Sequence, residues 1–120
     1  MRRFKWFKTS EFDSPDKEGS GKYMEAIVIE KLDLARDIYG APMIVTSGFR
    51  TIEHNKLVGG SSSSSHLLGW AVDVHCASSH KRFLMLEAML DAGFNRIGIG
   101  DDFLHVDCDP EKPDLLIWTY

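Results

Sequence analysis

Imidazole and carboxylate side chains stand in this sequence at places where apolar alternation would otherwise continue. His66 follows a run of five serines, and Asp73 and His75 interrupt the apolar segment at residues 70–76. His105 and Asp107 interrupt a second apolar segment at residues 103–108. Because an unpaired carboxylate is costly to bury, such groups must be hydrogen-bonded, ion-paired or bound to a metal ion.

Three of these residues would make a set suited to a catalytic zinc ion. His66, Asp73 and His105 supply three protein ligands, which leaves one position of a tetrahedral zinc ion open for water. Imidazole and carboxylate oxygen both suit zinc, and the absence of cysteine argues against a closed structural site. The spacing alone does not separate a metal site from ordinary polar residues.

Two predicted strands must position this set. In residues 69–76 the odd-numbered residues from Ala71 share the face that carries Asp73, and the even-numbered residues share the other face. In residues 103–108 the side chains of His105 and Asp107 again share one face. Residues 96–100 form a further strand joined to it through the turn at Asp101 and Asp102, and residues 115–118 form a final edge strand.

Two helices accompany these strands. The spacing predicts a helix over residues 22–39, with Gly40 beyond its end. Its apolar residues fall on one face: Met24, Ile27, Leu34 and Ile38. A second helix is predicted over residues 79–92, with Ser78 or Ser79 as its N-cap and Gly93 after it.

The remaining segments complete one predicted domain over residues 1–120. Residues 1–21 are polar and read as an irregular N-terminal arm, residues 43–47 as a short buried strand, and residues 48–60 as a loop with one helical turn. The order of elements predicts an α+β fold with a small, largely antiparallel sheet and flanking helices.

Composition excludes several classes of partner. The chain has 120 residues, 43% of them hydrophobic and 27% charged, as expected for a globular protein. Its net charge of −4 offers no basic surplus for nucleic acid. The basic start has no apolar run after it, so we expect no secretory signal. No segment reaches the roughly 20 apolar residues of a membrane span, and we expect a monomer.

Three ordered motifs resemble the zinc D-Ala-D-Ala carboxypeptidase family, in particular its small phage and bacterial members that cut peptidoglycan stem peptides. The family pattern Ser-x-His-x-x-Gly-x-Ala-x-Asp is filled at every position, by Ser64, His66, Gly69, Ala71 and Asp73. Its later histidine followed by x-Asp matches His105 and Asp107. Its upstream Ser-Gly-aromatic-Arg matches residues 47–50.

The resemblance implies that His66, Asp73 and His105 hold zinc. It also implies a general acid/base shortly before the last ligand, either a histidine two residues upstream or an acidic residue three upstream. Phe103 fills the first of these places, so we expect Asp102 to serve, with Asp101 as the alternative.

Other site residues have supporting roles in the same reading. Arg50 would bind the oxyanion or a substrate carboxylate. Asp107 would orient a ligand or stabilise the loop by hydrogen bonding. His75 would support the ligand residues from outside the metal shell or have a purely structural role. Ser64 would hydrogen-bond locally at the end of a mobile serine loop, with residues 61–63 free to move.

The resemblance further implies a Hedgehog/DD-peptidase-like fold and a zinc metallopeptidase. It would act on peptidoglycan stem peptides as a D-Ala-D-Ala carboxypeptidase or an L-Ala–D-Glu endopeptidase. We expect a phage or prophage lytic enzyme, made in the bacterial cytoplasm and acting on the cell wall after release. The alternative is a non-catalytic, zinc-stabilised binding module of a virion or wall-associated assembly, as the Hedgehog signalling domain keeps zinc without established peptidase work.

The two cysteines, Cys76 and Cys108, each lie three residues beyond a proposed ligand. If Asp73 and His105 face each other on antiparallel strands, the cysteines lie about 20 Å apart at about 3.3 Å per residue. That separation is well beyond disulfide reach, so both thiols are predicted to stay reduced.

Overall fold

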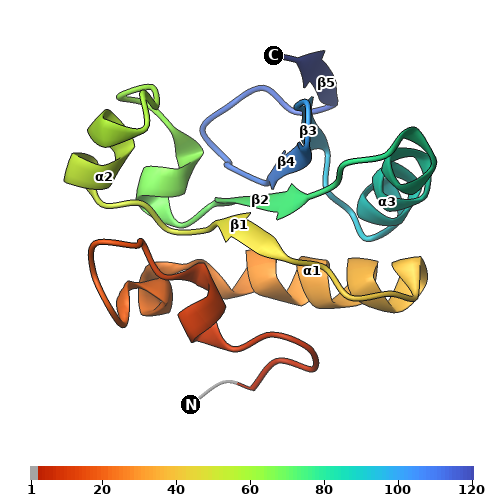
Figure 1. Ribbon diagram of the computed structural model, residues 1–120, viewed down its shortest axis with the longest axis horizontal. Helices are drawn as coiled ribbons and strands as arrows, with labels where there is room; N and C mark the ends of the chain where they lie inside the picture. The colour runs from red at the N-terminus through yellow and green to blue at the C-terminus, as the bar shows by residue number, and fades with distance from the viewer. Residues whose placement is uncertain (1–2) are drawn as a thin grey trace.

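The computed structural model describes residues 3–120, which are arranged around a five-stranded sheet in the order β1-β2-β4-β3-β5 (Figure 1). Neighbouring strands are antiparallel except for β3 and β5, which are parallel. The α+β class and the largely antiparallel sheet are therefore confirmed. The strands are β1 Val45–Ser47, β2 Ala71–His75, β3 Arg96–Ile99, β4 Phe103–Asp107 and β5 Leu116–Thr119.

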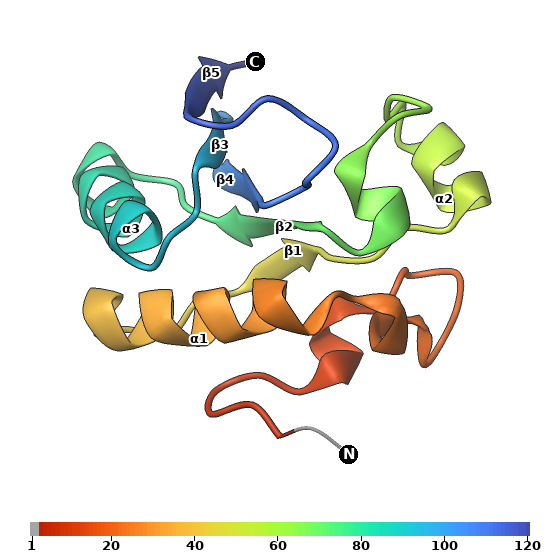
Figure 2. The same cartoon turned by 180° about the vertical axis from the view of Figure 1, so that it is seen from behind.

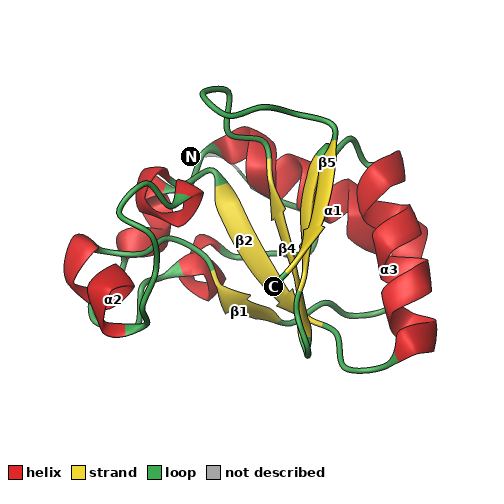
Figure 3. Cartoon of the chain, turned by 90° about the horizontal axis from the view of Figure 1, so that it is seen from above, coloured by secondary structure: helices red, strands yellow, loops and turns green. Residues whose placement is uncertain are grey.

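Within residues 3–120, three α-helices and three short 3-10 helices flank the sheet. Helix α1 runs along β1 and β2, and α2 and α3 lie at opposite ends of the molecule (Figures 2 and 3). None of the helices in residues 3–120 is both long enough and apolar enough to cross a lipid bilayer. The helices are α1 Ala26–Tyr39, α2 Ile52–Leu57, α3 Ser79–Asp91, η1 Thr9–Phe12, η2 Ser20–Tyr23 and η3 Ser65–Leu68.

The period-two alternation of the central strands divides the sheet into an apolar and a polar face. The apolar face packs against α1 and α3 and belongs to one cluster of buried residues. The odd-numbered residues of β2 and β4 point to the opposite face, as the sequence predicts. The sheet residues in the apolar cluster are Val72, Val74, Ile97, Leu104 and Val106.

The register of β2 and β4 places two of the three candidate ligands side by side. Asp73 is paired directly with His105 across antiparallel strands. This confirms the arrangement from which reduced cysteines were predicted, and Cys76 and Cys108 are free thiols.

Helix α1 departs from its prediction in both its start and its buried face. It begins at Ala26 because Met24 and Glu25 have extended backbones, and the chain before them forms η2. The predicted face is wrong, since Ile27, Leu34 and Ile38 are 43%, 48% and 44% exposed. The helix face that packs against the core includes the small residue Ala35 and no lysine, whereas a lysine interrupts the exposed apolar face. The core-facing residues are Val28, Ile29, Leu32 and Ala35.

The N-terminal segment is not an irregular arm, although residues 1–2 of the predicted arm lie outside the described residues. Phe7 and Phe12 are buried in the core, and their rings meet edge to face at 5.7 Å. The Phe12 carbonyl accepts a hydrogen bond from the Phe49 amide at 2.9 Å. The segment therefore packs against the loop that carries Gly48 and Arg50, two residues of the candidate site.

The other helical predictions agree with the structure. The N-cap of α3 is Ser78, whose hydroxyl accepts from the Lys81 amide at 3.2 Å. Helix α2 supplies the predicted turn of helix, and Thr51 caps it. Strand β1 forms but is half-exposed at the sheet edge, whereas Met43 before it is buried.

Candidate metal centre

His66, Asp73 and His105 come together from three separate elements. His66 lies in η3, where the Ser64 hydroxyl caps the turn by accepting from the His66 amide at 3.3 Å. Asp73 is central in β2, and His105 is central in β4. All three side chains are buried, and one donor atom from each lies within 4.8 Å of the other two.

The distances suit a small divalent cation. Asp73 Oδ1 lies 3.2 Å from His66 Nε2 and 2.9 Å from His105 Nδ1. Bonds of about 2.0–2.2 Å to a tetrahedral zinc ion would separate neighbouring donors by roughly 3.4 Å. The donors therefore approach the spacing of a zinc coordination shell with small adjustments.

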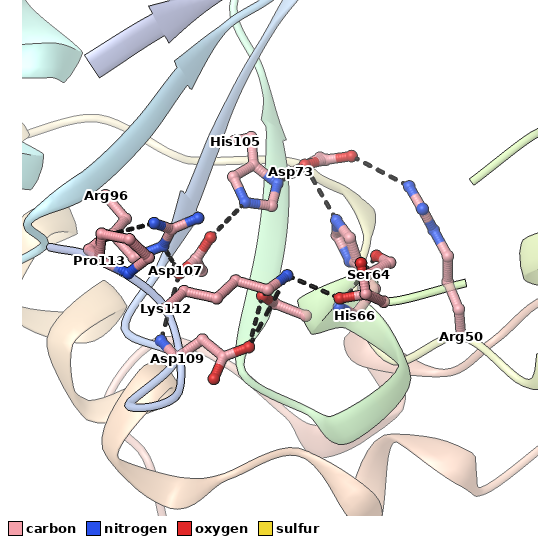
Figure 4. A network of polar contacts seen from close by, with 12 residues as sticks. Arg50, Ser64, His66, Asp73, Arg96, His105, Asp107, Asp109, Lys112 and Pro113 are labelled. Carbon is pink, nitrogen blue, oxygen red and sulfur yellow. Dashed lines mark hydrogen bonds and ion pairs between the residues drawn. The ribbon is translucent and has the colours of Figure 1, made fainter. Parts of the chain in front are cut away.

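In each imidazole, the outer nitrogen, which points away from Asp73, has a hydrogen-bond partner of its own. This bond fixes the tautomer of the ring. His66 Nδ1 donates to the Gly48 carbonyl at 2.7 Å, and His105 Nε2 donates to Asp107 Oδ2 at 2.7 Å (Figure 4). In the neutral tautomers the inner nitrogens, His66 Nε2 and His105 Nδ1, then carry lone pairs. Lone pairs that face a carboxylate require a proton or a metal ion between them, so the donor set fits a cation.

Asp107, which accepts the hydrogen bond from His105, is itself held by two further hydrogen bonds. Its Oδ1 accepts from Arg96 Nε at 2.7 Å and from the Asp109 amide at 3.2 Å. Arg96 also donates through Nη1 to the Pro113 carbonyl (Figure 4). Arg96 was not predicted as part of this site, although the hairpin register pairs it directly with Asp107.

Arg50 contacts the carboxylate oxygen of Asp73 that the two histidines do not contact. Its Nη2 is 3.4 Å from Asp73 Oδ2, and its Nε donates to the Ser47 hydroxyl at 3.0 Å. Nη1 donates to Asn55 Oδ1 at 3.2 Å. The guanidinium therefore touches the ligand carboxylate directly, through the oxygen that the histidines leave free.

The charges of the centre are set by this network. Burial opposes the ionisation of Asp73, but hydrogen bonds with His105 and His66 outweigh it and hold its pKa well below the usual range. Burial likewise opposes ionisation of Asp107, yet the bond from His105 keeps that pKa low. Burial lowers the pKa of His66. The pKa of His105 is raised, since its two carboxylate partners outweigh burial.

A cavity of about 340 Å³ opens over the three candidate ligands. Of the residues singled out from the sequence, it brings together Arg50, Ser64, His66, Asp73, His105 and Asp107. Trp118, which the sequence allows as either a core or a groove-lining residue, lines this cavity, together with three residues not predicted for it, Arg96, Lys112 and Tyr120.

Three of the residues singled out from the sequence lie elsewhere. Asp101 and Asp102 are exposed in the turn before β4, where Asp102 offers its backbone carbonyl to the Cys76 amide at 2.8 Å. His75 is exposed at the end of β2 and lines a different hollow beside Tyr39 and Lys81. Their predicted roles stay predictions.

The serine segment is tied down by hydrogen bonds at its two ends. The Ser61 carbonyl accepts from Asn55 Nδ2 at 2.8 Å. Lys112 Nζ donates to the Ser63 carbonyl at 2.7 Å and to the Ser65 hydroxyl at 2.8 Å. These bonds hold the Ser61 and Ser63 carbonyls, and the movement expected of residues 61–63 stays a prediction.

Comparison with known proteins agrees with this geometry. A family model described as Peptidase M15 matches residues 6–109, which include all three candidate ligands. No curated protein matches the chain. Because the match covers most of the sequence, the chain belongs to the peptidase M15 family.

Proposed function

We propose that this protein is a zinc-dependent peptidase that hydrolyses peptide bonds in peptidoglycan stem peptides. The observation that carries the proposal is the convergence of His66, Asp73 and His105, with the outer nitrogen of each imidazole already engaged. Peptidases of this family are zinc-dependent, and the donor set of this chain has the chemistry that zinc requires.

Zinc bound there would supply Lewis-acid polarisation of the scissile carbonyl and a water of lowered pKa. The protein's own residues would orient the substrate and complete the charge balance. Asp107 and Gly48 hold the two imidazoles in fixed tautomers. Arg50 lies beside Asp73, where a guanidinium can bind a developing oxyanion or a substrate carboxylate.

We assign the general acid/base to Asp102, with Asp101 as the alternative. A carboxylate in this role would take a proton from the attacking water and pass it to the leaving amine. Both aspartates lie in the exposed turn before β4, outside the residues that line the cavity. The assignment therefore requires this turn to bring a carboxylate toward the cavity when substrate binds.

Two bonds are the candidate targets: the terminal D-Ala–D-Ala bond and the L-Ala–D-Glu bond inside the stem. We propose a monomeric phage or prophage enzyme that is made in the bacterial cytoplasm and reaches the wall after release.

A second candidate function is a zinc-stabilised binding module without catalysis. The observation that favours it is the position of Asp102, which the structure does not bring to the cavity. Such a module would keep its zinc and bind stem peptides unchanged.

Mass spectrometry of peptides released from purified peptidoglycan separates the two candidates. Zinc-loaded protein, a chelated sample, Asp102→Asn and Asp101→Asn would be compared. A product that disappears on chelation establishes the peptidase, and its mass identifies the bond. Loss of product in one aspartate variant alone identifies the acid/base, and activity in both variants refutes the assignment. Stoichiometric zinc without any product supports the binding module.

A further inference from the structure

The C-terminal segment lies beyond the family match and still forms part of the cavity. The match ends at residue 109, whereas Lys112, Trp118 and Tyr120 all line the cavity. Strand β5 carries Trp118, Tyr120 follows directly after it, and the parallel pairing of β5 with β3 brings this end of the chain to the site.

A row of directly paired residues crosses the sheet through the metal centre. Asp73 pairs with His105, His105 with Gly98, and Gly98 with Trp118. Ser47 of β1 pairs with Asp73 at the other end of the row. Directly opposed residues share a face of the sheet, so Trp118 lies on the same face as both ligands.

Gly98 allows Trp118 to reach the centre across a whole strand. A Cβ atom at position 98 would lie 2.7 Å from Trp118 Nε1 and 2.9 Å from Tyr120 Cε2, which is closer than such atoms approach. With only hydrogen there, the indole lies against the β3 backbone, and its ring centre is 5.5 Å from that of His105.

The indole is also fixed from the side. The Arg96 guanidinium lies 5.2 Å from the Trp118 ring, and Arg96 is itself bonded to Asp107. The Tyr120 ring extends the surface towards Phe103, with ring centres 5.3 Å apart. We name the surface formed by Phe103, Trp118 and Tyr120 the aromatic wall.

The opposite end of the row is cationic. Arg50 is bonded to Ser47 and to Asp73, at the β1 end of the row. The candidate ligands therefore lie between the Arg50 guanidinium on one side and the aromatic wall on the other, where the Arg96 guanidinium beside Trp118 is paired with Asp107. A substrate that lies along the row meets different chemistry on the two sides of its scissile bond.

The two candidate bonds share a matching asymmetry. Each has alanine on its amino side, and each has a residue with a free carboxylate on its carboxyl side. We infer that the substrate lies across the strands with the alanine methyl on Trp118 and the carboxylate at Arg50. This inference rests on the proposed function and identifies Trp118 as a residue that determines specificity.

Substrate selectivity tests this orientation. Synthetic stem peptides would carry alanine or glycine on the amino side of the cleaved bond, and a carboxylate or an amide on the carboxyl side. Zinc-loaded wild type, Trp118→Ala and Thr119→Ala would be compared through kcat and KM. Thr119 is a matched control, because it follows Trp118 in β5 and points to the other face.

Wild type should prefer alanine to glycine by roughly 10-fold in kcat/KM, as expected for a methyl group in an apolar site. Trp118→Ala should lower this preference to near unity while retaining the preference for carboxylate over amide. Thr119→Ala should behave as wild type. An unchanged preference for alanine in Trp118→Ala, or loss of the carboxylate preference instead, would overturn the orientation.

Binding gives a readout that does not depend on turnover. The Trp118 indole N–H signal, assigned by comparison with Trp118→Phe, should shift on addition of the alanine stem peptide and shift much less with the glycine peptide. If wild type cleaves no peptide, the proposed function fails, and this signal decides the inference separately. Equal shifts with both peptides would contradict it.

Discussion

The two faces of β2 and β4 are both buried, yet different forces hold them. On the core face Val74 and Leu104 are fully buried among other apolar side chains. On the cavity face Asp73, His105 and Asp107 are only 9%, 7% and 1% exposed. Apolar burial is non-directional, whereas each polar group here depends on a particular partner. Changes on the core face should therefore lower stability, and changes on the cavity face should lower metal affinity.

The largest effect on the cavity face should come from Asp73→Asn. The amide keeps the size of the side chain but removes the charge that faces both imidazoles, so zinc affinity should fall by more than about 100-fold and activity should disappear. Titration with zinc measures the affinity, and circular dichroism checks that the fold is retained. Stoichiometric zinc at wild-type affinity would show that Asp73 is not a ligand.

The core face should give the opposite result in Leu104→Ala. Removal of a fully buried leucine should lower the free energy of unfolding by about 2–5 kcal/mol. Denaturant titration measures this loss, and zinc stoichiometry below the unfolding transition should stay unchanged. Loss of zinc binding in the folded variant would mean that the two faces are not separable.

A smaller effect should follow from Asp107→Asn, which leaves all three ligands in place. An amide satisfies Arg96 and His105 less well than a carboxylate, so zinc affinity should fall by about 10–100-fold. A direct zinc titration beside Asp73→Asn ranks the two variants. An equal loss in both would place Asp107 among the ligands.

Acid should weaken the cavity face first in the chelated protein. Asp107 has a lowered pKa in the folded state, so its contribution is fully present above the ordinary value of about 3.9 and is lost as the pH falls toward the folded value. Thermal unfolding between about pH 2 and pH 5 should therefore show a shallower loss of stability toward acid in Asp107→Asn than in Leu104→Ala. Equal dependence of stability on pH in the two variants would show that Asp107 does not contribute to the loss of stability in acid.

No change is expected in the redox state of the two cysteine thiols. Cys76 and Cys108 lie at opposite ends of the β2–β4 pair, so the intact mass should be the same with and without reductant. A mass about 2 Da lower that reductant restores would require another arrangement of the strands.

The sequence predicted the parts of this molecule that depend on local periodicity. Strict alternation identifies β2 and β4, and the serine N-cap and following glycine locate α3. Asp101 and Asp102 mark the turn of the hairpin whose register pairs Arg96 with Asp107. The position of Arg96 beside Asp107 could therefore have been predicted from the same pattern.

The remaining features depend on contacts distant in sequence. Two stripes of α1 are apolar, and packing against the sheet buries the one with Leu32 and Ala35. Phe12 is buried because its segment folds back on Gly48. Trp118 reaches the cavity because β5 pairs with β3, a neighbour that local pattern does not identify.

The outer position of β5 has a consequence for how this molecule could be redesigned. The strands that carry Asp73 and His105, β2 and β4, are paired with each other and do not contact β5 as sheet neighbours. Residues on the cavity face of β5 can therefore be exchanged as a module, on an edge of the sheet, without rebuilding the strands that supply the donor atoms. Libraries randomised at Trp118 and Tyr120 would accordingly explore new substrates with all three candidate ligands retained, and zinc titration would show how far the contact of Trp118 with His105 affects the centre.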